Sequence, residues 1–231
     1  MKERPILMCG EMVIATLEER KTQTRRTNHL DYINKNPSEW EYVEYLALKK
    51  EHLFVTKNDG QDYVQTKCPY GQPGDRLWVR ETWTLGDIVD DEEPSIQIYY
   101  RADGTKVDFA VNHEAADKYI QKLEYLEVYG NGGDNWLPSI FMPRWASRIT
   151  LEIVSVRVER VQDITISDCV AEGIHDSKDL TFPLKGSGIE KAEYRLLWDK
   201  INSKRGYSWE NKPWVWAIEF KKYPELRHHD H

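Results

Sequence analysis

The sequence has little cysteine and lacks any long apolar run. Its 231 residues include three cysteines, Cys9, Cys68 and Cys169, which form no CxxC pair. An odd number of widely spaced cysteines does not build a disulfide framework and is typical of reduced thiols in a cytoplasm. No run of about 18 apolar residues is present, and Glu11 interrupts the apolar patch near the N-terminus. We therefore expect a cytoplasmic protein with neither a membrane span nor a signal peptide.

An excess of basic residues is also absent. The formal net charge is −7, which argues against a protein that coats nucleic acid by general neutralisation of phosphates. The charge is unevenly distributed, because residues 20–26 contain four bases and no acid, whereas residues 87–93 contain five acids and no base. A local basic site on an acidic chain suits a small polar or anionic ligand, or a short nucleic-acid segment. A solvated helix end beside a solvated acidic loop explains the same pattern.

No internal repeat and no linker-like stretch divides the chain, so we expect one domain over residues 1–231. Aromatic residues make up 12% of the sequence, with nine Trp and thirteen Tyr. Such rings supply core packing and also stacking surfaces for unpaired bases, and composition does not separate the two uses. Residues 224–231 are expected to form a mobile tail whose histidines bind metal only adventitiously, and we expect no resident metal and no cofactor.

Hydrophobic periodicity predicts strands mixed with a few helices. In GDRLWVRETW, residues 74–83, the side chains of Leu77, Val79, Glu81 and Trp83 share one face of a strand. Because that face is apolar, Glu81 is expected to be buried. A long strand is predicted over 147–161, with a change of phase after Ile153 that indicates a bulge or burial on both faces.

Helical spacing predicts four helices, over residues 11–20, 112–126, 166–173 and 189–201. The predicted apolar stripe of the last helix consists of Ala192, Leu196, Leu197 and Ile201. The segment 40–64 has the pattern of a hairpin with turn residues at 58–60.

Four motifs follow one another along the chain: ERKTQTRR at residues 19–26, GDRLWVRE at 74–81, ISDCVAEGI at 166–174 and WVWAIEFKK at 214–222. In their content and order they resemble the ASCH family, a branch of the PUA-like superfamily. The longer stretches CPYGQPGDRLWVRETW and MPRWASRI are similar to phage-encoded members of that family. The resemblance predicts an α+β fold, a mixed and mostly antiparallel PUA-like β-barrel with flanking helices and insertions near 40–63 and 94–138.

One small bacterial branch of the family removes the acetyl group from N4-acetylcytidine without a metal. The resemblance implies that, in this chain, Lys21 would be the proton acceptor and Thr24 the nucleophile. A threonine hydroxyl becomes nucleophilic only when a neighbouring base removes its proton. The glutamate that donates the proton has two candidates. Glu172 lies in the corresponding helix, although Ile174 occupies the aligned position, and Glu81 is expected among apolar groups that would favour its protonated form.

The same segment can bind a ligand without chemistry, because PUA-related proteins bind RNA. The candidate ligand-binding residues are mostly arginines of the four motifs and of MPRWASRI: Arg20, Arg25, Arg26, Arg76, Trp78, Arg80, Arg144, Trp145 and Arg148. Each is also compatible with a solvated surface or with core packing. We therefore predict a protein that binds RNA, single-stranded nucleic acid or a modified nucleoside through a basic, aromatic-lined pocket. Amidohydrolysis of N4-acylated cytidine is the alternative, followed by a ribonuclease or a phage factor that binds a bacterial host protein in the host cytoplasm.

Overall fold

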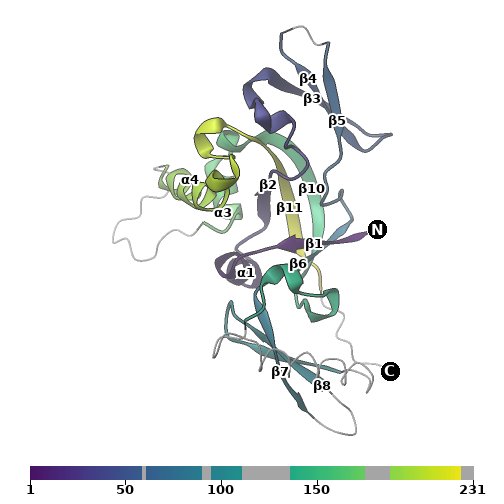
Figure 1. Cartoon of the computed structure of the whole chain (residues 1–231), viewed down its shortest axis with the longest axis vertical. Coiled ribbons are helices and arrows are strands. Elements are labelled where there is room, and N and C mark those ends of the chain that lie inside the picture. Colours follow the sequence, from purple (N-terminus) through teal and green to yellow (C-terminus); the bar gives the residue numbers. More distant parts are fainter. Residues whose placement is uncertain (59–60, 90–94, 111–135, 175–187, 225–231) are drawn as a thin grey trace. The chain divides into compact units, whose positions relative to one another are not determined.

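The computed structural model describes residues 1–58, 61–89, 95–110, 136–174 and 188–224 (Figure 1). The strands are β1 (Glu3–Leu7), β2 (Gln23–Arg26), β3 (Trp40–Leu46), β4 (Glu51–Thr56), β5 (Tyr63–Thr66), β6 (Arg76–Arg80), β7 (Trp83–Val89), β8 (Ser95–Tyr100), β9 (Lys106–Ala110), β10 (Thr150–Arg160) and β11 (Trp214–Lys222). The α-helices are α1 (Gly10–Leu17), α3 (Ile166–Ala171) and α4 (Ile189–Asn202). Short 3-10 helices are η1 (Ile33–Lys35), η2 (Pro37–Glu39), η3 (Ser139–Phe141), η4 (Arg144–Ala146), η5 (Val161–Asp163), η6 (Ser203–Arg205) and η7 (Trp209–Asn211).

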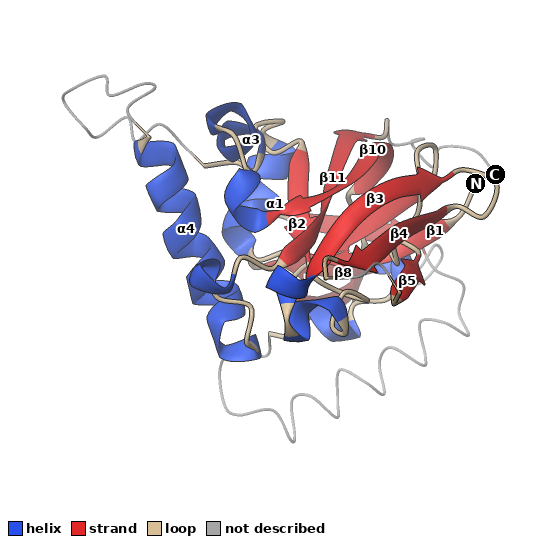
Figure 2. Cartoon of the chain, turned by 90° about the horizontal axis from the view of Figure 1, so that it is seen from above, coloured by secondary structure: helices blue, strands red, loops and turns tan. Residues whose placement is uncertain are grey.

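The fold is α+β with mostly antiparallel sheets. Figure 2 shows its helices in blue and its strands in red. A five-stranded sheet has the order β1-β6-β10-β11-β2, and two three-stranded sheets have the orders β3-β4-β5 and β7-β8-β9. The expected strands that begin at Arg76 and Trp214 therefore belong to one sheet. The predicted helix at 112–126, most of the insertion at 94–138 and the tail after residue 224 lie outside the described residues.

The chain divides into two compact units. The first comprises Met1–Arg4, Glu18–Leu77 and Leu151–Tyr223, and the second comprises Pro5–Leu17, Trp78–Thr150 and Pro224–His231. Neither unit is one continuous stretch, because the boundary between them falls within β1 and within β6.

β11 belongs to the first unit and is buried along most of its length. It pairs antiparallel with β10 on one side and with β2 on the other. The β3-β4-β5 sheet packs against it through rings, since Phe54 lies 5.4 Å from Trp214 and His52 lies 4.8 Å from Trp216, measured between ring centroids. Strands buried on both faces read as continuous apolar runs, which explains the sequence WVWAIEF.

The predicted irregularity of the long strand is confirmed. The β10–β11 register shifts between Ile153 and Ser155. Leu151 and Ile153 are buried, whereas Val154 is half exposed. A bulge inserts one extra residue and so reverses which side chains point inward.

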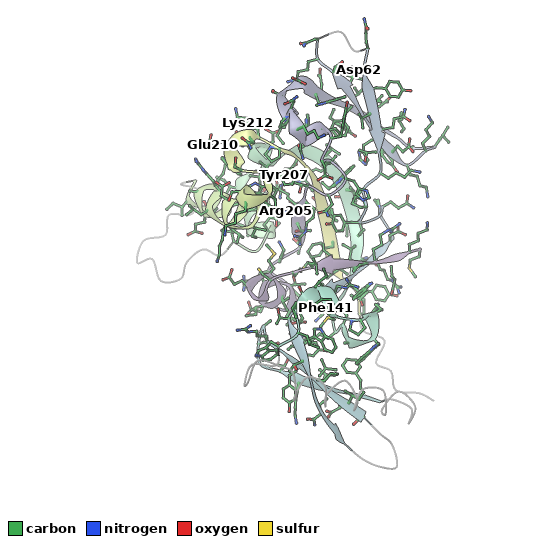
Figure 3. The ribbon with its side chains drawn as sticks, viewed as in Figure 1. Asp62, Phe141, Arg205, Tyr207, Glu210 and Lys212 are labelled. Carbon is green, nitrogen blue, oxygen red and sulfur yellow. The ribbon has the colours of Figure 1, made fainter. Side chains whose placement is uncertain are left out.

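Helix α4 buries a different stripe from the predicted one. Its buried side chains include Tyr194 and Trp198, which belong to the first unit's helical core cluster, and Trp198 donates its indole N–H to the carbonyl of Tyr207 (labelled in Figure 3). Leu196 is 72% exposed and Ile201 38% exposed, so the predicted stripe is wrong. The larger aromatic side chains occupy the buried face because they bury more apolar area than leucine does.

The second unit is built around the β7-β8-β9 sheet. Its core holds Trp83, Leu85, Ile96, Ile98, Tyr100, Met142 and Ala146, with Trp145 packed at the edge. The strand predicted to run through Trp83 breaks after Arg80, and β7 begins at Trp83. The predicted inward face of this segment is nevertheless right, since Val79, Glu81 and Trp83 are all buried.

Helix α1 stops at Leu17, three residues before its predicted end at Arg20. Glu19, just beyond the helix, has a left-handed backbone with φ 58°.

Candidate functional site

The KTQTRR segment lies in the interior of the first unit rather than on a basic surface. Lys21 precedes β2, and Gln23, Thr24 and Arg25 belong to it. All four side chains are buried, and α3 packs beside β2. Buried charges persist only when they are paired and hydrogen-bonded, so the segment requires acidic partners.

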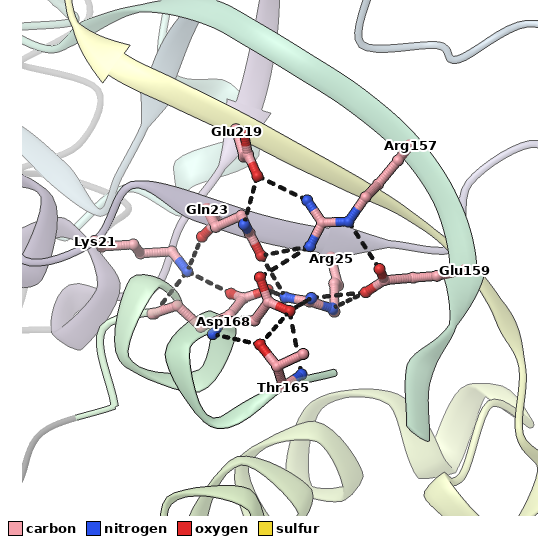
Figure 4. A network of polar contacts seen from close by, with 9 residues as sticks. Lys21, Gln23, Arg25, Arg157, Glu159, Thr165, Asp168 and Glu219 are labelled. Atoms are coloured by element: carbon pink, nitrogen blue, oxygen red, sulfur yellow. Dashed lines mark hydrogen bonds and ion pairs between the residues drawn. The ribbon is translucent and has the colours of Figure 1, made fainter. Parts of the chain in front are cut away.

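Glu172 is the partner of Lys21. The Lys21 Nζ donates to the Glu172 Oε2 at 2.6 Å, to the Glu172 carbonyl oxygen at 2.8 Å and to the Gln23 carbonyl oxygen at 2.8 Å (Figure 4). An ammonium group has three N–H donors, and here each has an acceptor. The Lys21 side chain is fully buried and that of Glu172 is 3% exposed.

Arg25 joins Glu172 to two further carboxylates. Its Nη1 donates to the Glu172 Oε1 at 3.1 Å, its Nε donates to the Glu159 Oε1 at 2.7 Å, and Asp168 lies within ion-pair distance. Burial alone would lower the pKa of the Arg25 guanidinium, but the negative charges of Glu172 and Glu159 raise it above its usual value. Arg25 is therefore a permanent cation within this network.

Arg157 of β10 extends the network toward solvent. It donates to Glu159 and Glu219 at 2.8 Å each and to Asp168 at 2.9 Å. Burial would raise the pKa of the Asp168 carboxyl, but hydrogen bonds from Thr165 and Gln23 and the charge of Arg25 hold it at about 2. Thr165 also caps α3 through the same aspartate, which fixes the helix that presents Glu172. We call Lys21, Gln23, Arg25, Arg157, Glu159, Asp168, Glu172 and Glu219 the buried charge network.

The buried charge network brings together three of the residues predicted from the motifs: Lys21, Arg25 and Glu172. Gln23 and Arg25 both point into it, because Arg25 donates to the Gln23 amide oxygen at 2.8 Å. Successive side chains of a strand point to opposite faces, so Thr24 faces away from the carboxylate of Glu172. Lys21 and Glu172 are also bonded to each other, because the Lys21 Nζ donates to the carboxylate and to the carbonyl oxygen of Glu172. This arrangement suits a structural ion pair better than a base and an acid that act on a substrate.

The other candidate glutamate belongs to the second unit. Glu81 accepts two hydrogen bonds from Arg148, from its Nε and its Nη2, at 2.8 Å each. Arg148 also binds Asp103 and lies 4.0 Å from the ring centroid of Tyr100. Burial raises the pKa of the Glu81 carboxyl, although the Arg148 partner opposes the shift. Arg148 is thus engaged with two acids and an aromatic ring, which leaves little of its guanidinium to contact a phosphate.

The remaining predicted binding residues have partners inside their own units. The Arg76 guanidinium stacks on Tyr223 at 3.6 Å, and that of Arg80 lies 4.6 Å from the ring centroid of Trp78. The others are an ion pair of Arg20 with Glu18, the pairing of Arg26 with Trp216 in the β2–β11 ladder, a hydrogen bond from Arg144 to Thr150, and the packing of Trp145 against Trp83.

A pocket of about 610 Å³ in the first unit was not predicted. Its lining contains six basic side chains and one acidic side chain: Lys2, Arg4, Lys49, Lys50, Lys67 and Arg157, with Asp75. The bases come from the N-terminus, the β3–β4 turn, the end of β5 and β10, so no single sequence motif contains them. The only local sign is the Lys49-Lys50 pair inside the predicted hairpin. We call this cavity the lysine pocket.

Aromatic rings form one wall of the lysine pocket. The ring centroids of Tyr45 and His52 are 4.9 Å apart, and the Tyr42 hydroxyl lies 3.3 Å from the His52 Nδ1. Burial lowers the pKa of the His52 imidazole to about 4, so this ring is neutral at pH 7. Tyr45 is 44% exposed, which leaves part of its ring open to a ligand. A neutral, hydrogen-bonding aromatic wall beside a group of lysines can hold a base and a phosphate together.

None of the protein-family models, curated proteins or solved structures compared with this chain matches it. Membership of the ASCH family therefore stays a prediction from the motifs. Among the described residues, no helix has the length and apolar character needed to cross a membrane. In the same part of the chain, no three His, Cys, Asp or Glu side chains are placed to hold a metal ion.

Proposed function

We propose that the chain binds single-stranded nucleic acid, RNA above all, in the lysine pocket. The observation that carries the proposal is the lining of that pocket, where six bases and three rings surround one carboxylate although the chain as a whole is acidic. Lysines hold phosphates as point charges, and unpaired bases stack on aromatic side chains. We also propose that the five-stranded sheet corresponds to a PUA-like barrel and that the protein works in a cytoplasm.

The contacts of the buried charge network favour binding over amidohydrolysis. A catalytic Lys21 would have to give up an ion pair with Glu172 and two carbonyl acceptors. The nucleophile Thr24 would have to act from the opposite face of β2. In this proposal the network is a scaffold: it fixes β2, α3 and β10, and β10 contributes Ser155, Val156 and Arg157 to the lysine pocket.

Binding is tested by fluorescence anisotropy with labelled RNA of about 10 nucleotides, single-stranded DNA and duplex at several salt concentrations. We expect saturable binding of single strands with a slope of log K against log salt of about −2. This value assumes that Lys2, Lys49 and Lys50, whose ammonium groups have no ion pair among the described residues, contact one phosphate each. Lys2→Ala with Lys49→Ala should weaken binding at least about ten-fold. The control is Lys200→Ala with Lys204→Ala, which removes the same charge from exposed lysines outside the pocket.

Absence of saturable single-strand binding at low salt, or an equal loss in the control pair, would contradict the proposal. If the protein released acetate from N4-acetylcytidine, and Thr24→Ala abolished that release, amidohydrolysis would replace nucleic-acid binding as the proposed function.

A further inference from the structure

The β3–β4 turn of the lysine pocket contains a lysine in an unfavourable backbone conformation. Lys50 has φ 57°, in the left-handed region that glycine and asparagine adopt most easily. The turn is closed by backbone hydrogen bonds, since the Lys50 N–H donates to the carbonyls of Leu46 at 2.8 Å and Ala47 at 3.3 Å. Glycine would make the same bonds with less strain. The turn itself therefore gives no reason for a lysine at this position.

The side chain of Lys50 does have a place in the molecule, because it lines the lysine pocket. Strained backbone that persists at a cavity suggests that the side chain it carries has a function. Its neighbour Lys49 lines the same cavity and makes one side-chain hydrogen bond, to Gln65 at 3.4 Å.

The pocket's other bases differ in how far they are already neutralised. Arg4 is paired with Asp75 at 3.1 Å, and Lys67 lies 3.5 Å from Glu51. Arg157 is paired with three carboxylates of the buried charge network. The backbone N–H of Lys2 donates to the Asp75 Oδ1 at 2.8 Å. Within the described part of the chain, the ammonium groups of Lys2, Lys49 and Lys50 have no carboxylate in ion-pair distance. Three lysine charges that share one cavity repel one another until a ligand brings negative charge.

From this charge balance we propose that Lys50, with Lys49 and Lys2, forms a subsite for two neighbouring phosphate groups at the β3–β4 turn. The inference rests on the proposed function for the source of those phosphates, which are either adjacent phosphodiesters of a strand or the diphosphate of a free nucleotide. A neutral nucleoside does not match three uncompensated cations. The ring of Tyr45, which lines the same pocket, then stacks on the base that follows.

Lys50→Gly separates this role from any contribution to folding. It removes the cation and also relieves the left-handed strain, so the unfolding temperature should stay the same or rise. Calorimetric titration with inorganic pyrophosphate at fixed ionic strength should show a loss of affinity of about ten-fold. For single-stranded RNA, the salt slope should become shallower by about 0.7, the value for one lost phosphate contact.

The matched control is Lys212→Gly. Lys212, labelled in Figure 3, also has a left-handed backbone, with φ 48°, and is exposed outside the lysine pocket. Lys212→Gly removes the same charge and the same kind of strain, and it should leave pyrophosphate affinity and the RNA salt slope unchanged.

The outcomes distinguish this subsite from the proposed function. RNA binding that Lys50→Gly leaves intact, with an unchanged salt slope, overturns the subsite while single-strand binding stands. Pyrophosphate binding that Lys50→Gly weakens, without any binding of RNA or single-stranded DNA, supports the subsite and assigns it to a free nucleotide. Equal losses in Lys50→Gly and Lys212→Gly overturn the subsite, because they show an effect of total charge alone.

Discussion

Lys21 and Glu172 meet in the interior although 151 residues separate them in the chain. Removing two charges from water is costly, and a buried ion pair compensates for that loss only when its geometry is good and its other hydrogen-bonding groups are satisfied. Both conditions hold here, because Nζ has three acceptors and the second carboxylate oxygen accepts from Arg25. Such a pair adds little net stability over apolar residues, but losing one partner leaves a charge without compensation.

Glu172→Gln should therefore destabilise the protein by about 3–5 kcal/mol, measured by urea unfolding at pH 7. Adding Lys21→Met should cost less than the sum of the two single changes, because the second substitution removes the uncompensated ammonium. Glu210→Gln is the control, since Glu210 pairs with Arg195 on the exposed surface and should change stability by at most about 0.5 kcal/mol. A Glu172→Gln effect as small as that of the control would contradict a structural role for the network.

His52 makes the stability of the first unit depend on pH. Its pKa is lowered from 6.5 to about 4 by burial, so the unfolded chain takes up a proton at a higher pH than the folded one. The His52 contribution is therefore fully present above pH 6.5 and is lost as the pH falls toward 4.

Between pH 6.5 and about 4, we expect the free energy of unfolding to fall by about 1.4 kcal/mol for each pH unit through this residue. In His52→Phe, the slope of the free energy of unfolding against pH should decrease by this amount between pH 6.5 and 5, because phenylalanine does not titrate. Urea unfolding at a series of pH values measures both curves. A variant whose curve stays parallel to that of the unchanged protein would show that His52 is not the group responsible.

At the scale of elements, helix α4 shows how its neighbours select the face that is buried. Tyr194 and Trp198 pack with Trp209 and Val215, whereas Leu196 faces solvent. Trp198→Ala should cost about 3–5 kcal/mol, and Leu196→Ala should stay within about 0.5 kcal/mol. Urea unfolding of the two variants measures the difference. Comparable losses would indicate that the leucine face is covered in solution.

The elements themselves were largely predictable from local pattern, and their partners were not. Alternation and helical spacing located β6, the irregular β10 and the helix after Gly188, because periodicity depends on neighbouring residues. The sequence of α4 offered two apolar faces, and only the packing of Trp209 decides between them. The end of α1 at Leu17 was missed because the left-handed Glu19 leaves no clear mark in the sequence.

At the scale of the whole molecule, the motifs predicted the composition of a site but not its exposure. Lys21, Arg25 and Glu172 do come together, and it was the resemblance to the ASCH family that paired Lys21 with Glu172. Their burial was not foreseeable, since four bases within seven residues are more often solvated than enclosed. The lysine pocket was missed because Lys2, Lys50 and Lys67 come from separate segments, and only tertiary contacts bring them into one cavity.

The pairing of two strands that lie far apart in the sequence has a consequence for synthesis on the ribosome. Gln23 of β2 is bonded to Glu219 of β11, which is translated 196 residues later. At about 5–20 residues per second, β2 waits roughly 10–40 s for its neighbour in the sheet. A waiting strand is a hazard for aggregation, and short, charged strands resist it. The four residues QTRR meet both conditions. Arg25, which binds carboxylates in the finished protein, and Arg26 are therefore expected to help keep the nascent chain soluble.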